Sequence, residues 1–326
     1  MKFDYTKYIR TYLLSLTPYK SAREEYEAEG RPMILLDANE NPFDSLVNRY
    51  PDPKQRELKK EIATWKGVDE NQIYLCNGSD EFISNVINGC CEPGKDSIMI
   101  VPPTFGMYKV SAKTYGVGIQ EVPLTSSFQL DVDSILEIAD ENSKIIFLPT
   151  PNNPTANNFD LDAVEQLIHG FPGLVVVDEA YAEFSSNPSV IPWLAKYPNL
   201  MVCQTFSKAQ GMAGARLGMA FAHSDFISFF NRIKAPYNIN SLTINAVKKR
   251  LKDQDKVKQE VDLLLKERQR LEEAFASISF IEKYFPSDAN FLMIRVDDSS
   301  IRYKQLLENG PVVRNSSKNL NCEKLN

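Results

Sequence analysis

The most reactive group that the sequence offers is a lysine placed directly after an apolar run. Lys208 follows the run LMVCQTF (200–206), with Ser207 beside it and Arg216 eight residues later. We expect an amine in this position to be partly removed from water, which favours its neutral, nucleophilic form. The serine hydroxyl and the guanidinium are suited to holding a phosphate. The small residues between them allow the backbone to pass close to a bulky planar ligand.

A carboxylate follows a second apolar run. Asp178 lies within LVVVDEA (174–180), and Tyr181 comes three residues after it. A carboxylate at a buried sheet edge is costly unless it has a partner. A structural cap or salt bridge would meet that need, and so would a bound ligand, so Asp178 alone leaves both interpretations open.

Two weaker signals accompany this pair. CNGSDEF (76–82) predicts a helix that begins at Ser79 and Asp80, where free backbone N–H groups and the helix dipole favour a phosphate. Ordinary helix capping gives the same pattern. In PTPNNPTANN (149–158), the Asn153 amide could point at a ligand oxygen, although proline-rich polar segments are usually simple turns.

The elements that position these residues alternate between short β-rich runs and helical stretches. Several runs are apolar on both faces, which predicts strands covered by helices on both sides, in an α/β domain with a mostly parallel sheet. Ligands of such sheets gather at the carboxyl ends of the strands, where the polar clusters fall. The runs are QIYLC (72–76), SIMIV (97–101), KIIFLP (144–149), LVVVDEA (174–180), LMVCQTF (200–206) and RLGMAFA (216–222).

Composition and charge argue against several other classes of protein. The 326 residues are 43% hydrophobic, enough for one large core and a smaller second one. The net charge of 37 − 43 = −6 is spread along the chain, which disfavours nucleic-acid and membrane partners. No stretch approaches the roughly 20 apolar residues of a membrane span, and we expect a cytoplasmic protein. Five cysteines without a CxxC pair, and only two histidines, predict buried thiols and no metal site.

The C-terminal part of the chain predicts a smaller second domain. Residues 246–276 are expected to form one long connecting helix, followed by a strand at 289–297 and a helix at 301–310 that Gly310 ends. The predicted apolar stripe of the long helix consists of Val257, Val261, Leu264, Leu265, Arg268 and Leu271. The expected divisions are an N-terminal arm (1–40) that contributes to the small domain and the substrate site, a large domain (41–240) and a small α+β domain (241–326).

Taken in order, the polar motifs resemble those of the fold-type-I, pyridoxal-phosphate-dependent aminotransferases. These motifs are NGSDE, PPTFGMY, PNNPT, DEAY, and SK with an arginine eight residues on. More narrowly, six segments resemble the histidinol-phosphate aminotransferase family: LTPYKSAR (16–23), DANENP (37–42), RYPDPKQRELK (49–59), CEPGKD (91–96), PPTFGMY (102–108) and APYNI (235–239). The resemblance implies a large domain with a mostly parallel seven-stranded sheet flanked by helices, and a smaller α+β C-terminal domain.

The resemblance also implies an activity. It is the ping-pong transfer of an amino group from L-histidinol phosphate to 2-oxoglutarate, giving imidazole-acetol phosphate and glutamate, a step in histidine synthesis. Lys208 would carry pyridoxal 5'-phosphate as a Schiff base and then move a proton. Asp178 would keep the ring nitrogen of the cofactor protonated. Asn153 and Tyr181 would hydrogen-bond its phenolic oxygen.

The remaining roles that the resemblance implies concern the ring face, the phosphate and the substrate. Phe105 would stack on the ring, where many relatives have tyrosine. The phosphate would be held by Ser207, Arg216 and the backbone at Ser79 and Asp80. Tyr50 would reach the cofactor of a second subunit, which implies a homodimer with shared active sites. Tyr19, Asn153 and Arg314 would contact the substrate.

Two departures from the family pattern carry expectations of their own. Ala156 stands where relatives usually have glycine, which would cost about 1 kcal/mol if the position has a positive φ. The sequence ends at Asn326, before the strand that bears a second substrate arginine in relatives. We therefore expect a truncated small domain and substrate binding weaker by about 2–5 kcal/mol. An aromatic aminotransferase, a threonine-phosphate decarboxylase and a cofactor-binding form without turnover stay open as alternatives.

Overall fold

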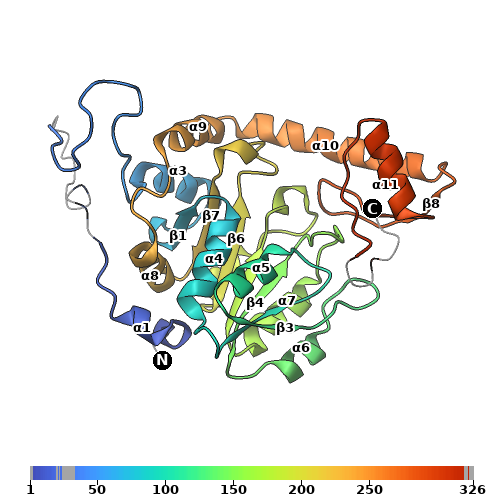
Figure 1. Ribbon diagram of the computed structural model, residues 1–326, viewed down its shortest axis with the longest axis horizontal. Helices are drawn as coiled ribbons and strands as arrows, with labels where there is room; N and C mark the ends of the chain where they lie inside the picture. Colours follow the sequence, from blue (N-terminus) through green and yellow to red (C-terminus); the bar gives the residue numbers. More distant parts are fainter. Residues whose placement is uncertain (1–2, 20, 22, 24–33, 319–321, 323–326) are drawn as a thin grey trace.

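One mixed sheet organises the chain in the computed structural model, which describes residues 3–19, 21, 23, 34–318 and 322 (Figure 1). Its seven strands are ordered β1-β7-β6-β5-β4-β2-β3. β7 runs antiparallel to both of its neighbours, and the other neighbouring pairs are parallel. The predicted seven-stranded, mostly parallel sheet is therefore confirmed. The strands are β1 (Ile73–Cys76), β2 (Ser97–Ile100), β3 (Gly118–Glu121), β4 (Ser143–Pro149), β5 (Leu174–Asp178), β6 (Leu200–Thr205) and β7 (Gly218–Ala222).

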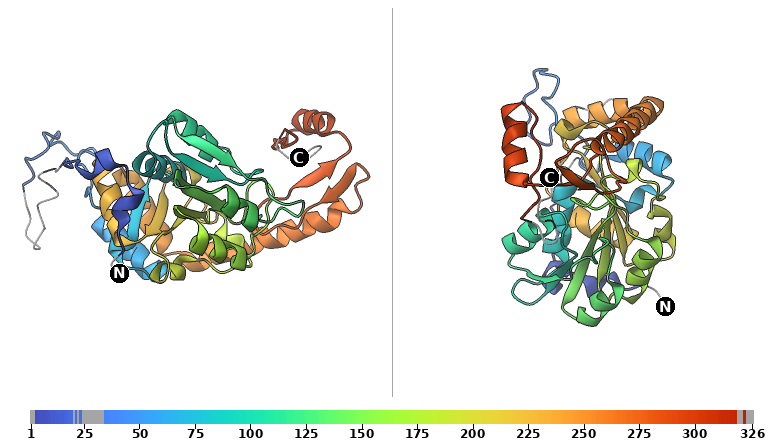
Figure 2. Two further views of the ribbon diagram at one scale, coloured as in Figure 1. Left: turned by 90° about the horizontal axis from the view of Figure 1, so that it is seen from below. Right: turned by 90° about the vertical axis from the view of Figure 1, so that its right-hand side faces the viewer.

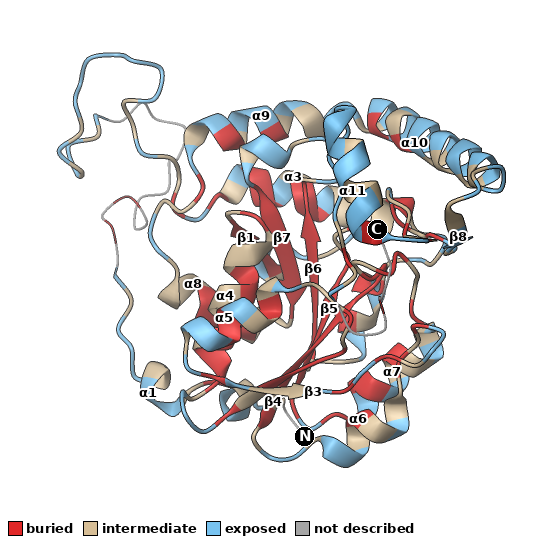
Figure 3. Cartoon of the chain, turned by 45° about the vertical axis from the view of Figure 1, so that its right-hand side comes forward, coloured by how far each residue is buried: buried red, intermediate tan, exposed pale blue. Residues whose placement is uncertain are grey.

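Helices cover both faces of the sheet, because alternate strand residues point to opposite sides. In β1, for example, Ile73 and Leu75 join one buried apolar cluster while Tyr74 and Cys76 join another. All strands of this sheet except β3 are buried nearly throughout, as Figure 3 shows for β5, β6 and β7. On the first face lie α3 (Arg56–Lys66), α6 (Val132–Ile138), α7 (Leu161–Gly170) and α9 (Ser241–Leu251), and on the second lie α4 (Ser79–Cys90), α5 (Met107–Thr114) and α8 (Ser224–Ile233).

The strand β3 was not among the six runs predicted from the sequence. Its residues Gly118–Glu121 are half-buried or exposed, and it pairs only with β2 at the edge of the sheet. A short edge strand with polar residues lacks the apolar pattern that marks a buried strand.

The long helix predicted at 246–276 is two helices in the structure. α9 ends at Leu251, and α10 (Gln254–Phe275) begins after a turn in which Asp253 N donates to Arg250 O at 3.0 Å. The predicted apolar stripe is only partly right. Val257 and Val261 are buried, whereas Leu264 and Leu271 are exposed.

The C-terminal elements form the small α+β unit expected from the sequence. β8 (Ile281–Tyr284) pairs antiparallel with β9 (Ile294–Val296), and α11 (Ser299–Glu308) follows. Gly310, with a φ of 101°, lies directly beyond that helix, as predicted. β8 was not predicted, and β9 is shorter than the expected strand.

The two ends of the molecule lie far apart. α10, β8 and α11 extend from one end of the large sheet, and the described residues of the N-terminal arm extend from the other (Figure 2). The arm's predicted contribution to the small domain therefore has no support within a single chain, and the domain boundaries at 40 and 240 stay predictions. Within the described part of the chain, no helix is long and apolar enough to cross a membrane.

Candidate active site

The polar residues that follow the central strands meet at one edge of the sheet. β1, β2, β4, β5 and β6 are mutually parallel, so their carboxyl ends share that edge. Because β7 runs in the opposite direction, its amino end brings Arg216 to the same place. A cavity of about 200 Å³ lies there. Its lining includes Ser79, Asp80, Phe105, Asn153, Asp178, Tyr181, Ser207, Lys208 and Arg216, all of which the sequence singled out.

Asp178 is the buried charge of this cavity. Its carboxylate accepts a hydrogen bond from Tyr108 Oη at 2.7 Å and another from Ala180 N at 3.1 Å. Burial raises the pKa of Asp178, and these two donors oppose the rise. The sequence predicted a partner for this carboxylate but not that Tyr108 supplies one. A tyrosine at a helix start, as in the GMY of PPTFGMY, looks like an ordinary core residue.

Lys208 lies at the cavity opening, three residues beyond the end of β6. Its Nζ is 5.2 Å from the centre of the Tyr181 ring. The expectation that the amine is partly removed from water is wrong for this structure, because Lys208 is exposed. The residues that follow, including Gly211, Ala213 and Gly214, are too small to shield it.

Part of the cavity lining is suited to an anion. α4 begins at Ser79, so its free N–H groups face this region. Arg216 Nη2 lies 3.6 Å from Asp80 Oδ2. Ser207 Oγ accepts a hydrogen bond from Thr205 Oγ1 at 3.0 Å. A hydroxyl, a guanidinium and a helix N-terminus thus converge on one end of the cavity.

Gly78 leaves the room that this arrangement needs. Its φ of 75° and ψ of 164° lie in a region that essentially only glycine occupies. A Cβ at this position would lie 2.5 Å from Arg216 Nη2. Any larger residue would therefore displace the guanidinium.

The two neighbouring asparagines of the PNNPT motif have different surroundings. Asn152 is fully buried, and its Nδ2 donates to Pro103 O at 2.9 Å and to Thr155 Oγ1 at 2.6 Å. Asn153 lines the cavity instead. Ala156, further along the loop, has a φ of 65°, so the conditional expectation of backbone strain of about 1 kcal/mol applies.

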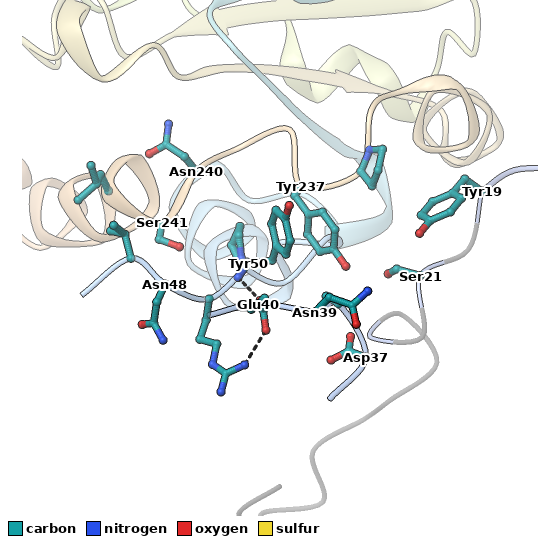
Figure 4. A pocket seen from close by; sticks show the side chains of 16 residues that line it. Tyr19, Ser21, Asp37, Asn39, Glu40, Asn48, Tyr50, Tyr237, Asn240 and Ser241 are labelled. Carbon is teal, nitrogen blue, oxygen red and sulfur yellow. Dashed lines mark hydrogen bonds and ion pairs between the residues drawn. The ribbon is translucent and has the colours of Figure 1, made fainter. Parts of the chain in front are cut away.

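Three predicted residues do not lie in the Lys208 cavity. Tyr50 and Tyr19 line a separate, larger cavity of about 1050 Å³ beside the N-terminal arm (Figure 4). The Tyr50 ring stacks on Tyr237, with ring centres 4.5 Å apart. Arg314 is exposed and lines neither cavity.

A partly buried charge network lies at this second cavity, and sequence reasoning missed it. Arg23 donates to Glu40 and to Asp37, each at 2.9 Å, and Arg49 donates to Glu40 at 2.9 Å. Tyr50 N also donates to Glu40 (Figure 4). Hydrogen bonding from Arg23 lowers the pKa of Glu40 to about 2. The acidic residues of DANENP and the arginine of LTPYKSAR were the features of the sequence that could have indicated this network.

Comparison with known proteins decides the family. Residues 32–324 match the family described as Aminotransferase class I and II. A histidinol-phosphate aminotransferase of Flavobacterium johnsoniae is 48% identical over 98% of this chain and 92% of that protein. The chain belongs to this aminotransferase family, in its histidinol-phosphate aminotransferase branch.

Solved aminotransferase structures share the fold. The histidinol-phosphate aminotransferase of Clostridium acetobutylicum superposes with a TM-score of 0.77 at 25% identity, covering 83% of this chain and 82% of that one. The Sinorhizobium meliloti enzyme, solved in complex with pyridoxal 5'-phosphate, gives a TM-score of 0.74 at 24% identity, covering 81% and 73%. These likenesses confirm the predicted fold class.

The cofactor of this aminotransferase family is pyridoxal 5'-phosphate, and the Lys208 cavity fits it. The cavity offers a primary amine for the aldehyde and a buried carboxylate for the ring nitrogen. At Gly78 a Cβ would fill the space beside Arg216 that a phosphate requires. The residues present therefore match the three polar ends of the cofactor.

Proposed function

We propose that this aminotransferase transfers the amino group of L-histidinol phosphate to 2-oxoglutarate, forming imidazole-acetol phosphate and glutamate. The observation that carries the proposal is the 48% identity to a curated histidinol-phosphate aminotransferase over 98% of the chain. The cavity supports it, because an amine, a buried carboxylate and an anion site lie together within it.

Lys208 has two tasks in this proposal. When bound, pyridoxal phosphate withdraws electrons from the substrate carbon that bears the amine and carries the amino group between the two substrates. Lys208 Nζ would hold the cofactor through its aldehyde group between turnovers. While the substrate amine is bound in its place, Nζ would act as the general base and acid that accepts the proton from the substrate carbon and returns it. Its exposed position at the cavity opening leaves the amine accessible for both tasks.

The other residues orient the cofactor and balance its charge. The Asp178 carboxylate would keep a proton on the ring nitrogen, and its negative charge would act more strongly there than in water because Asp178 is buried. Arg216, Ser207 and the start of α4 would hold the phosphate. Tyr181 and Asn153 would bind the phenolic oxygen, and Phe105 would cover the ring face.

Product analysis tests the proposed substrate. The purified protein, loaded with pyridoxal phosphate, is given L-histidinol phosphate and 2-oxoglutarate, and glutamate is measured against a Lys208→Ala control. We expect glutamate only with the unaltered protein. A parallel reaction with threonine phosphate tests the decarboxylase alternative, and release of carbon dioxide there without glutamate formation in the first reaction would overturn the assignment.

We also propose that the chain forms a homodimer in which Tyr50 completes the partner's site. Two observations support this. Tyr50 lines a cavity other than the one that contains Lys208. Large apolar side chains of the segment that precedes Tyr50 are more than three-quarters exposed, namely Ile34, Leu36, Phe43 and Leu46. Clustered exposed apolar residues of this kind mark protein–protein contacts.

A mixing experiment tests the shared site. Tyr50→Ala and Lys208→Ala each remove one contribution, so each homodimer is expected to be inactive. After mixing under conditions that exchange subunits, half the dimers are hybrids and each hybrid has one complete site. Activity should then recover to about a quarter of the unaltered level, as expected for a two-fold symmetric dimer. No recovery despite demonstrated subunit exchange would show that Tyr50 acts within its own chain or not at all.

A further inference from the structure

Tyr108 is a fully buried tyrosine whose hydroxyl touches the cavity's carboxylate. It lies in the first turn of α5, and its ring stacks on Phe147 of β4 with centres 4.5 Å apart and planes within 10°. Its Oη donates to Asp178 Oδ2 at 2.7 Å. This is a short, charge-assisted hydrogen bond between two buried side chains, where such bonds are strong.

The same ring also contacts Phe105. The two rings meet edge to face, with centres 5.6 Å apart and planes at 85°. Tyr108 therefore touches both Phe105, which would cover the ring face of the cofactor, and Asp178, which would hold its ring nitrogen. The Tyr108 side chain, which packs on Phe147 of the sheet, therefore fixes the positions of Phe105 and Asp178 relative to each other.

We propose that Tyr108 is a positioning residue for catalysis, which holds the Asp178 carboxylate oriented and ionised opposite the cofactor's ring nitrogen. The inference rests on the proposed role of Asp178. Burial raises the pKa of Asp178, and the Tyr108 hydroxyl is the stronger of the two hydrogen bonds that oppose this rise. Without that hydroxyl, the bond from Ala180 N is the one that the described residues still give this carboxylate.

A packing role alone does not account for the hydroxyl. Phenylalanine would fill the same volume between Phe147 and Phe105, and a buried hydroxyl needs a partner to offset its loss of hydration. The carboxylate is the partner that Tyr108 has. Among the other groups near Asp178, Asp80 favours the protonated carboxyl and Lys208 favours the charged form.

The test is Tyr108→Phe, with Tyr74→Phe as the matched control. Tyr74 is equally buried, and its Oη is also hydrogen-bonded, to Asn85 at 2.8 Å, but it does not line the cavity. For Tyr108→Phe we expect the dissociation constant for pyridoxal phosphate to rise, and kcat to fall, by about tenfold or more each, with KM within about twofold. Tyr74→Phe should change none of these, although both variants lose some thermal stability.

Asp178→Asn separates the proposed role of Asp178 in the site from the proposed role of Tyr108 in holding Asp178. If the hydroxyl acts through Asp178, Tyr108→Phe should have less than about a twofold further effect in the Asp178→Asn background. If Asp178→Asn itself leaves cofactor affinity and kcat unchanged, the proposed role of Asp178 is wrong. If Asp178→Asn is impaired but Tyr108→Phe matches Tyr74→Phe, the role of Asp178 stands and the inference about Tyr108 is overturned.

Discussion

Gly78→Ala isolates the contribution of Arg216 to cofactor binding. The new Cβ would lie 2.5 Å from Arg216 Nη2, well inside van der Waals contact. Because that atom is the end of a flexible side chain, the guanidinium would move and the protein would still fold. Arg216 would then no longer point at the phosphate position, and the cofactor should bind more weakly.

The magnitude follows from two separate terms. The backbone at Gly78, with φ 75° and ψ 164°, should cost about 1–3 kcal/mol of folding stability once a side chain is present. Loss of one charge-assisted hydrogen bond to the phosphate is worth about 1.5–3 kcal/mol, which weakens cofactor binding by roughly 10- to 150-fold. Only the second term appears in the dissociation constant.

Gly67→Ala is the control for strain. Gly67 also has a positive φ, of 69°, but a Cβ there would meet nothing within 4 Å. The assay is thermal unfolding of each variant without cofactor, followed by titration with pyridoxal phosphate monitored by absorbance. Both variants should unfold at lower temperature, and only Gly78→Ala should lose cofactor affinity.

A double-mutant cycle with Arg216→Ala completes the test. If Gly78→Ala acts through the guanidinium, its effect on the dissociation constant should largely vanish in the Arg216→Ala background. An undiminished effect in that background, or normal affinity of Gly78→Ala itself, would refute the reasoning.

Two further predictions concern the loops around the site. Asp288 accepts hydrogen bonds from Asn158 N and Ser186 Oγ, each at 3.0 Å, and these bonds connect the small unit to the loop that contains Asn153. Asp288→Ala should therefore lower the free energy of unfolding by about 1–2 kcal/mol and raise the KM for the substrate. The control is Asp298→Ala, which removes the N-cap of α11; it should lose similar stability in the same denaturant titration but keep the KM of the unaltered protein. If Asp288→Ala and Asp298→Ala have the same KM, the connection between Asp288 and the Asn153 loop does not affect the site. Glu40→Gln should lower the free energy of unfolding by about 1–2 kcal/mol at pH 7, because it weakens the charge-assisted hydrogen bonds from Arg23 and Arg49. Because the pKa of Glu40 is lowered from 4.5 to about 2, the difference in unfolding free energy between Glu40→Gln and the unaltered protein is fully present above pH 4.5 and should shrink as the pH falls toward 2. A difference, measured by urea unfolding, that does not change with pH would contradict this prediction.

The sequence predicts much of the large domain because the polar site residues come at or near the ends of the strands in the chain. Asp178 and Lys208 come at or soon after the ends of apolar runs, so their meeting at one edge followed from the parallel order. Arg216 reaches the same edge for a reason that the sequence does not display, namely the reversed direction of β7.

Other features were beyond sequence reasoning for physical reasons. Tyr108 acts through a contact 70 residues away in the chain, and nothing local distinguishes it from a core tyrosine. The exposure of Lys208, Leu264 and Leu271 depends on what packs nearby, which is set by tertiary structure. The roles of Tyr50, Tyr19 and Arg314 stay predictions, because the first two lie at a different cavity and Arg314 lines neither.

The absorbance spectrum of the purified, cofactor-loaded protein tests the central claim most directly. It is recorded alone, after L-histidinol phosphate, and after further addition of 2-oxoglutarate, beside Lys208→Ala. We predict a band of lysine-bound cofactor that Lys208→Ala lacks, that gives way to pyridoxamine phosphate with the first substrate and that returns with the second. A protein that shows no such band, or whose band is indifferent to L-histidinol phosphate, would contradict the proposed function.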